Sequence, residues 1–141
     1  MFFGSFVYAL DDKGRLVIPA KMRGECGSTL FAMRGFEQCL SLYPAKNFDD
    51  LVAKLSQYDY LQADVRPFVR LALSSVLELS IDSHGRIQLP VDTLKQYKLS
   101  KQVSILGVQD HLELWDLDTW TNYEKNMQDS YDHFGGQGEK K

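Results

Sequence analysis

The stretch DDKGRLVIP, residues 11–19, recurs as DSHGRIQLP, residues 82–90. Both copies follow one pattern: Asp, two variable residues, Gly, Arg, an aliphatic residue, a variable residue, a second aliphatic residue and Pro. We call this the DxxGR motif. Because a recurring motif of this kind defines the structural unit of a fold, the chain is interpreted as a tandem duplication.

The repeat continues beyond the motif. RGFEQCLSLY, residues 34–43, aligns with LGVQDHLELW, residues 106–115, and Phe48 aligns with Trp120. The glycine, two leucines and a closing aromatic residue recur at equivalent places. The first alignment has an offset of 71 (11 to 82) and the second an offset of 72 (34 to 106), so one residue is inserted between them.

Alternating apolar side chains over residues 6–10 and again over 16–18 predict two strands joined by the DxxG turn as a β-hairpin. Asp can accept backbone N–H bonds in such a turn, and Gly can adopt the positive φ that it needs. The Pro that closes each motif should end the return strand and open a short helix. A second hairpin is expected in each half, over residues 29–43 and 102–115.

Three further helices are predicted from apolar spacing. Phe48, Leu51 and Leu55 form one stripe of a helix over residues 45–58. Later helices should begin near Asp64 and near Asp116 or Asp118. The glycine-rich residues after Ser130 show no periodicity, which predicts an irregular tail.

These patterns predict a mainly β protein with accessory helices, of the α+β class. We divide it into a first domain over residues 5–47, a helical connector over 48–75, a second domain over 76–119, and a C-terminal helix with a flexible tail over 120–141. A unit of about 45 residues is too small to bury a good core alone. The two units should therefore interlock into one compact, barrel-like body.

The composition is that of an ordinary globular protein. The chain has 141 residues, 44% of them hydrophobic, and it contains no apolar run long enough to span a membrane. Its formal charge of −3 disagrees with the basic excess of many nucleic-acid-binding proteins. However, eight of the nineteen acidic residues follow residue 102, far from the first motif.

The two turns carry different charges. The first presents Lys13 and Arg15 on either side of Gly14, where Arg can fork onto a phosphate or a guanine edge and Gly lets the backbone approach closely. The second has His84 and Arg86 and lacks the Lys. We therefore expect the first turn to bind DNA more strongly than the second. The alternative is that Asp and Arg of the motif only stabilise the turn.

Two other functional classes, an enzyme and an interaction scaffold, are also compatible with parts of the sequence. An enzyme could pair His84 with Asp82, or Cys39 with His111, but no nucleophile elbow or phosphate-binding loop accompanies them. An interaction scaffold could assemble through the apolar helix stripes without touching nucleic acid. Two cysteines and three scattered histidines predict neither a disulfide framework nor a metal site. Without a secretory signal, the default compartment is the cytosol.

The paired motifs, the segments ending LSLY and LELW, and the length resemble the MraZ family, bacterial proteins of two SpoVT-AbrB-type domains. The resemblance implies a transcriptional regulator that forms ring-shaped homo-oligomers. Such a regulator binds tandem repeats in the promoter of the division and cell-wall gene cluster, in the cytoplasm at the nucleoid. It implies no catalysis, cofactor, metal, membrane or small-molecule substrate.

The DNA-contacting residues of the family lie in the DxxGR motif. The resemblance assigns this role to four residues of the first turn, Asp11, Lys13, Gly14 and Arg15. In the second turn it extends to Asp82 and Arg86, and to His84, which stands where the family commonly has a basic or small residue.

Overall fold

A computed structural model describes residues 1–139, which form one six-stranded antiparallel sheet, a separate two-stranded ribbon and helices around them. The strand order in the sheet is β1-β7-β8-β4-β3-β5, and the ribbon consists of β2 and β6. In chain order the elements are β1 (Ser5–Ala9), β2 (Arg15–Val17), α1 (Ala20–Cys26), β3 (Thr29–Arg34), β4 (Leu40–Pro44), α2 (Ala45–Leu55), α3 (Val65–Ser74), β5 (Leu77–Ser80), β6 (Arg86–Gln88), α4 (Val91–Gln96), β7 (Gln102–Val108), β8 (His111–Asp116), α5 (Leu117–Asn126) and α6 (Gln128–Glu139).

The strands on either side of each DxxGR turn do not pair with each other, so the predicted first hairpin is wrong. Strand β1 pairs with β7, and the strand after the turn, β2, pairs with β6 of the other half. In this ribbon Leu16 lies opposite Ile87, and both side chains are fully buried. Apolar alternation identified the buried face of each strand correctly, but it does not specify the partner strand.

The second hairpins are confirmed, and they join the two halves. Strands β3 and β4 pair, as do β7 and β8, and β4 also pairs with β8 across the middle of the sheet. The halves therefore interlock as expected. The sheet ends at β1 and β5, however, and within residues 1–139 it does not close into a barrel. The barrel-like part of the prediction is wrong.

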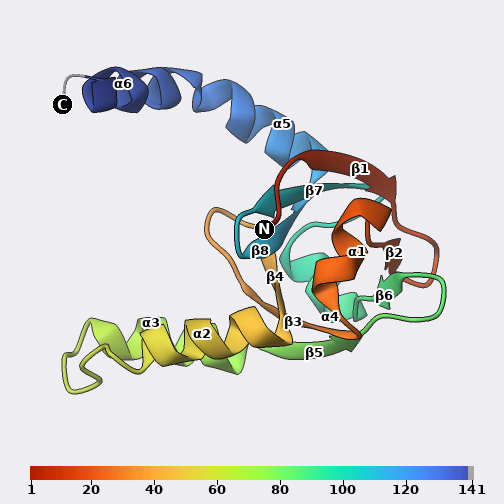
Figure 1. The fold of residues 1–141 in the computed structure, drawn as a ribbon, viewed down its shortest axis with the longest axis horizontal. Coiled ribbons are helices and arrows are strands. Elements are labelled where there is room, and N and C mark those ends of the chain that lie inside the picture. The colour runs from red at the N-terminus through yellow and green to blue at the C-terminus, as the bar shows by residue number, and fades with distance from the viewer. Residues whose placement is uncertain (140–141) are drawn as a thin grey trace.

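The main core lies between the sheet and the ribbon, where aliphatic side chains of both halves meet. Among its fully buried members are Leu16, Ile18, Leu30, Leu42, Ile87, Val103, Ile105, Leu112 and Leu114. Helices α1 and α4 lie beside the ribbon, each starting directly after the Pro of its motif, as predicted. Figure 1 shows that α2 with α3, and α5 with α6, extend away from the ribbon on the opposite side of the molecule.

The remaining helices follow the sequence closely except at the end of the chain. Helix α2 ends at Leu55, and α5 begins after Asp116, whose side chain accepts a hydrogen bond from the Thr119 N–H. The irregular tail predicted after Ser130 is instead helical through Glu139. Bonding from the Tyr131 N–H to the Met127 carbonyl continues from α5, so α6 extends an existing helix and avoids the cost of nucleating one. The last two predicted tail residues lie outside the described part of the chain.

Candidate functional site

The first DxxGR turn is held together by its aspartate. One oxygen of Asp11, Oδ1, accepts hydrogen bonds from the backbone N–H groups of Lys13 (2.9 Å) and Arg15 (2.8 Å). The other oxygen, Oδ2, accepts one from Nε of Arg15 at 2.6 Å. Asp11 therefore shapes the turn and fixes the base of the arginine side chain.

The second turn repeats this geometry. Oδ1 of Asp82 accepts from the backbone N–H groups of His84 and Arg86, both at 2.9 Å, and Oδ2 accepts from Nε of Arg86, also at 2.9 Å. The interpretation that Asp and Arg stabilise the turn is confirmed in both halves. Within residues 1–139 the side chains of these two arginines form hydrogen bonds through Nε alone.

Both aspartates stay ionised at neutral pH. The backbone hydrogen bond from Arg15, followed by the bonds from the Arg15 side chain and from Lys13, lowers the pKa of Asp11 despite some desolvation. The pKa of Asp82 is lowered in the same way by Arg86 and His84. Each turn consequently contains a carboxylate that offsets one positive charge.

Each turn needs its glycine. Gly14 and Gly85 both have φ of 75°, a conformation that other residues rarely adopt. A Cβ atom on Gly14 would also lie 2.8 Å from the Leu89 carbonyl oxygen. Gly14 is therefore required by the fold, and the structure gives it this role independently of any ligand.

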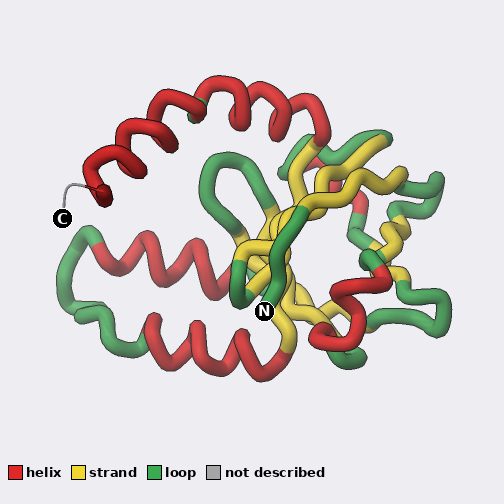
Figure 2. The backbone as a smooth tube through the Cα atoms, turned by 45° about the horizontal axis from the view of Figure 1, so that its top comes forward, coloured by secondary structure: helices red, strands yellow, loops and turns green. Residues whose placement is uncertain are grey.

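The ribbon connects each turn to the other half of the chain. The Leu89 N–H donates to the Gly14 carbonyl, and the Ile18 N–H donates to the Gly85 carbonyl, both at 2.9 Å. The Gln88 side chain donates to the Lys13 carbonyl at 3.0 Å. Both turns project from the side of the molecule that is farthest from α3 and α6 (Figures 1 and 2).

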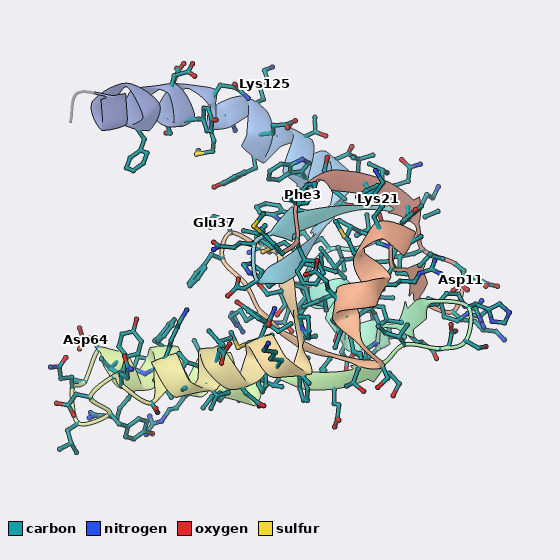
Figure 3. All side chains as sticks on the ribbon, in the orientation of Figure 1. Phe3, Asp11, Lys21, Glu37, Asp64 and Lys125 are labelled. Atoms are coloured by element: carbon teal, nitrogen blue, oxygen red, sulfur yellow. The ribbon has the colours of Figure 1, made fainter. Side chains whose placement is uncertain are left out.

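The arginines are placed to bind an anion. Their side chains are about one-third exposed, at 30% for Arg15 and 28% for Arg86. Among residues 1–139, no hydrogen bond involves their two terminal nitrogens. Lys13 is exposed beside Arg15, and Asp11 marks this edge of the molecule in Figure 3. A forked guanidinium next to exposed backbone suits a phosphate oxygen or a base edge.

A third arginine, which the sequence interpretation did not include, reaches the second turn from α1. Nε of Arg23 donates to the Ile18 carbonyl at 2.8 Å, and its guanidinium lies against Gly85. The signal was present in the repeat: at the offset of 71, Arg23 aligns with Leu94 (23 + 71 = 94), so a charge replaces an apolar residue.

The residues of the alternative enzyme site do not form a reactive arrangement. Asp82 bonds to the backbone N–H of His84, and the His84 ring contacts the Ser83 hydroxyl instead. Cys39 is buried, and desolvation together with the nearby charge of Glu113 raises the pKa of its thiol to about 12. A thiol with so high a pKa provides almost no nucleophilic thiolate at neutral pH.

His111 belongs to a partly buried polar cluster at the start of β8. Its Nδ1 contacts Asp110 at 2.7 Å, and its Nε2 contacts Glu113 at 3.0 Å. Trp115 donates to the second oxygen of Glu113, and the ring of Tyr43 stacks on the imidazole. Both imidazole nitrogens are thus occupied by carboxylates, which is an arrangement that stabilises a charged histidine.

This cluster predicts a pH-dependent stability. Burial opposes the charge on His111, but hydrogen bonds to Glu113 and Asp110 outweigh it and raise its pKa above the ordinary 6.5. The stabilisation is therefore complete below that ordinary value and is lost as the pH rises through the raised pKa. Between about pH 6 and about pH 9, the midpoint of thermal unfolding should fall more for the wild type than for His111→Gln. An equal fall in both proteins would contradict this role.

Within residues 1–139, no group of three or more His, Cys, Asp or Glu side chains is placed to hold a metal ion. No helix in this range combines the length and apolar character needed to cross a bilayer.

Fold and site together define a duplicated protein of the α+β class, in which two arginine-bearing turns are each completed by the other half. Comparison with known sequences agrees with this duplication. A family model described as "MraZ protein, putative antitoxin-like" matches residues 1–71 and 73–134. The chain belongs to the MraZ family.

Curated relatives cover nearly the whole chain. The protein is 39% identical over 132 residues to the transcriptional regulator MraZ of Syntrophomonas wolfei, covering 94% of this chain and 92% of the relative. It is 41% identical over 133 residues to the transcriptional regulator MraZ of Lactiplantibacillus plantarum, covering 94% of each chain. These relatives are named as regulators and not as enzymes, in agreement with a non-catalytic protein.

Proposed function

We propose that the protein is a sequence-specific DNA-binding transcriptional regulator. The observation that carries this proposal is the pair of DxxGR turns, which share one geometry and project from one side of the molecule. At the first turn, Arg15 contacts DNA with its terminal nitrogens and Lys13 neutralises a phosphate. Asp11 and Gly14 hold the turn in the shape that presents them.

The overall charge determines how such a protein binds DNA. With a net charge of −3, the chain as a whole gains little non-specific affinity for DNA from its charge. One chain that presents a few cations binds weakly, and several chains joined in one assembly bind tightly, because linked sites raise avidity by about 10²–10⁴ when their geometry matches. We therefore propose a ring-shaped homo-oligomer that engages tandem repeats in promoter DNA.

Exposed apolar side chains support the self-association. On the projecting helix α6, Tyr131 is 80% exposed and Phe134 is 77% exposed. Leu61, in the loop between α2 and α3, is 86% exposed. Exposed apolar groups that lie close together, as Tyr131 and Phe134 do three residues apart on α6, are typical of surfaces that meet another chain. The proposed target is the promoter of the division and cell-wall gene cluster, which places the protein in the cytoplasm at the nucleoid.

The proposal is tested by fluorescence anisotropy at fixed salt with promoter DNA that contains one repeat, several repeats, or the same bases shuffled. We expect DNA with several repeats to bind about 10²–10⁴ times more tightly than DNA with one. Shuffled DNA should bind weakly. Equal affinity for promoter and shuffled DNA would reject sequence-specific regulation. If the protein forms oligomers but binds neither promoter DNA nor shuffled DNA, the interaction scaffold is the better interpretation.

Lys13→Gln tests the first turn within this experiment. Because each neutralised phosphate contributes about 0.9 to the dependence of log affinity on log salt, the variant should flatten that slope by about one for each chain bound. Lys54→Gln, which removes the same charge from α2 on the far side of the molecule, should leave the slope unchanged. If both variants behave alike, Lys13 is not a DNA contact.

A further inference from the structure

Arg23 occupies a fixed position against the second turn. A Cβ atom placed on Gly85 would lie only 2.3 Å from Cζ of Arg23 and 2.4 Å from its Nε. The guanidinium thus fills the space that the missing side chain of Gly85 leaves. Its Nε donates to the Ile18 carbonyl at 2.8 Å, which anchors the group at one end.

The other half uses an apolar residue at this place. Leu94, which aligns with Arg23 at the offset of 71, lies over Gly14, and its Cδ1 would be 3.2 Å from a Cβ there. Each half therefore lends one helix side chain to the glycine of the other half's turn. Covering the glycine does not require a charge, because Leu94 performs that task at the first turn.

Arg23 also changes the balance of charges at the second turn. The first turn has two cations, Lys13 and Arg15, but also two acids, Asp11 and Asp12. The second turn itself has one permanent cation and one acid, Arg86 and Asp82. With Arg23 included, the second turn has two permanent cations and one acid.

Arg23 is also available to a ligand. Its side chain is partly exposed, and within residues 1–139 it forms no ion pair with Asp or Glu. The structure gives a hydrogen bond for Nε alone, so the two terminal nitrogens have no hydrogen-bond acceptor among the described residues. Because the anchored side chain is already ordered, binding an anion costs it less conformational entropy than it would cost a free lysine.

We infer that Arg23 is a DNA-contacting residue, which supplies to the second turn the positive charge that Lys13 supplies to the first. The inference rests on the proposed function and extends it. The second turn then contacts the DNA backbone through Arg23 and Arg86, and the absence of a Lys in its motif does not make it the weaker turn.

The decisive variant is Arg23→Leu. Leucine is the residue that covers the equivalent glycine in the other half, so the turn stays covered while the charge is lost. We expect the salt slope of binding to multi-repeat DNA to flatten by about one for each chain bound. We also expect the affinity at fixed salt to fall about tenfold for each chain bound, as for the loss of one charge-assisted contact. Lys54→Gln is the control for the loss of a distant positive charge.

A second variant separates binding from structure. Arg23→Lys keeps the charge but loses the guanidinium that bonds to Ile18, so it should retain most of the salt slope even if the protein unfolds at a lower temperature. If Arg23→Leu keeps the wild-type slope and affinity while Arg15→Gln loses binding, the inference is overturned and the proposed function stands. If the wild type itself binds promoter and shuffled DNA equally, the proposed function fails, whatever the variants do.

Discussion

Arg15→Gln is expected to weaken binding to promoter DNA by about five- to 150-fold for each turn engaged. This range corresponds to the 1–3 kcal/mol that a well-placed arginine contact to a base contributes. The variant loses both terminal nitrogens, which have no hydrogen bonds within the described residues and are therefore available to DNA. In an assembly that engages several turns the losses multiply, so DNA with several repeats should show the larger defect.

The structural cost of this variant is small, which makes the result interpretable. The ion pair between Arg15 and Asp11 is open to solvent, and solvent-screened pairs of this kind contribute little to the stability of the folded protein. Thermal unfolding of Arg15→Gln should therefore stay close to that of the wild type. Arg15→Lys is the matched control: it keeps the charge, loses the fork, and should show an intermediate affinity. Unchanged anisotropy for Arg15→Gln would remove Arg15 from the interface.

Gly107→Ala is expected to destabilise the folded protein by about 3 kcal/mol. A Cβ atom at this position would lie 2.3 Å from the backbone nitrogen of Phe3 and 2.7 Å from its Cα. Backbone atoms cannot rotate away as a side chain can, so the N-terminal segment must move. That movement strains the Gly107 N–H bond to the Gly4 carbonyl and exposes Phe2, which is buried in the main core.

Gly24→Ala provides the opposite outcome from the same substitution. Gly24 lies inside α1, and a Cβ there would have no neighbour within 4 Å. Alanine should stabilise the helix by about 0.5–1 kcal/mol relative to glycine. Chemical denaturation of the two variants measures both effects. A destabilisation of Gly107→Ala no larger than the change in Gly24→Ala would show that the N-terminal segment is not anchored at Gly107.

The sequence predicts most elements of this fold because their signals are local. Pro19 and Pro90 correctly locate the starts of α1 and α4, and the pattern around Gly35 correctly locates the hairpin of β3 and β4. The pairing of β2 with β6 of the other half could not be predicted from local signals. The alternation around Leu16 is satisfied equally by pairing with the preceding strand or with a strand of the other half.

In the candidate site too, contacts between residues close in sequence could be predicted and a long-range contact could not. Asp11 and Arg15 are four residues apart, so their bond follows from the turn itself and could be expected from the motif. Arg23 and Gly85 are 62 positions apart (85 − 23), and their contact depends on the exchanged ribbon. A comparison of the two halves would have shown only that a charge stands where the other half has Leu94.

Because β2 and β6 pair with each other, neither turn is built from one half of the duplicated chain alone. Each turn takes its motif from one half and its covering side chain from the helix of the other half. A substitution in α1 therefore changes the second turn, and a substitution in α4 changes the first. Selection can thus adjust the two turns independently, making one more basic or more apolar, while both copies of the motif remain intact.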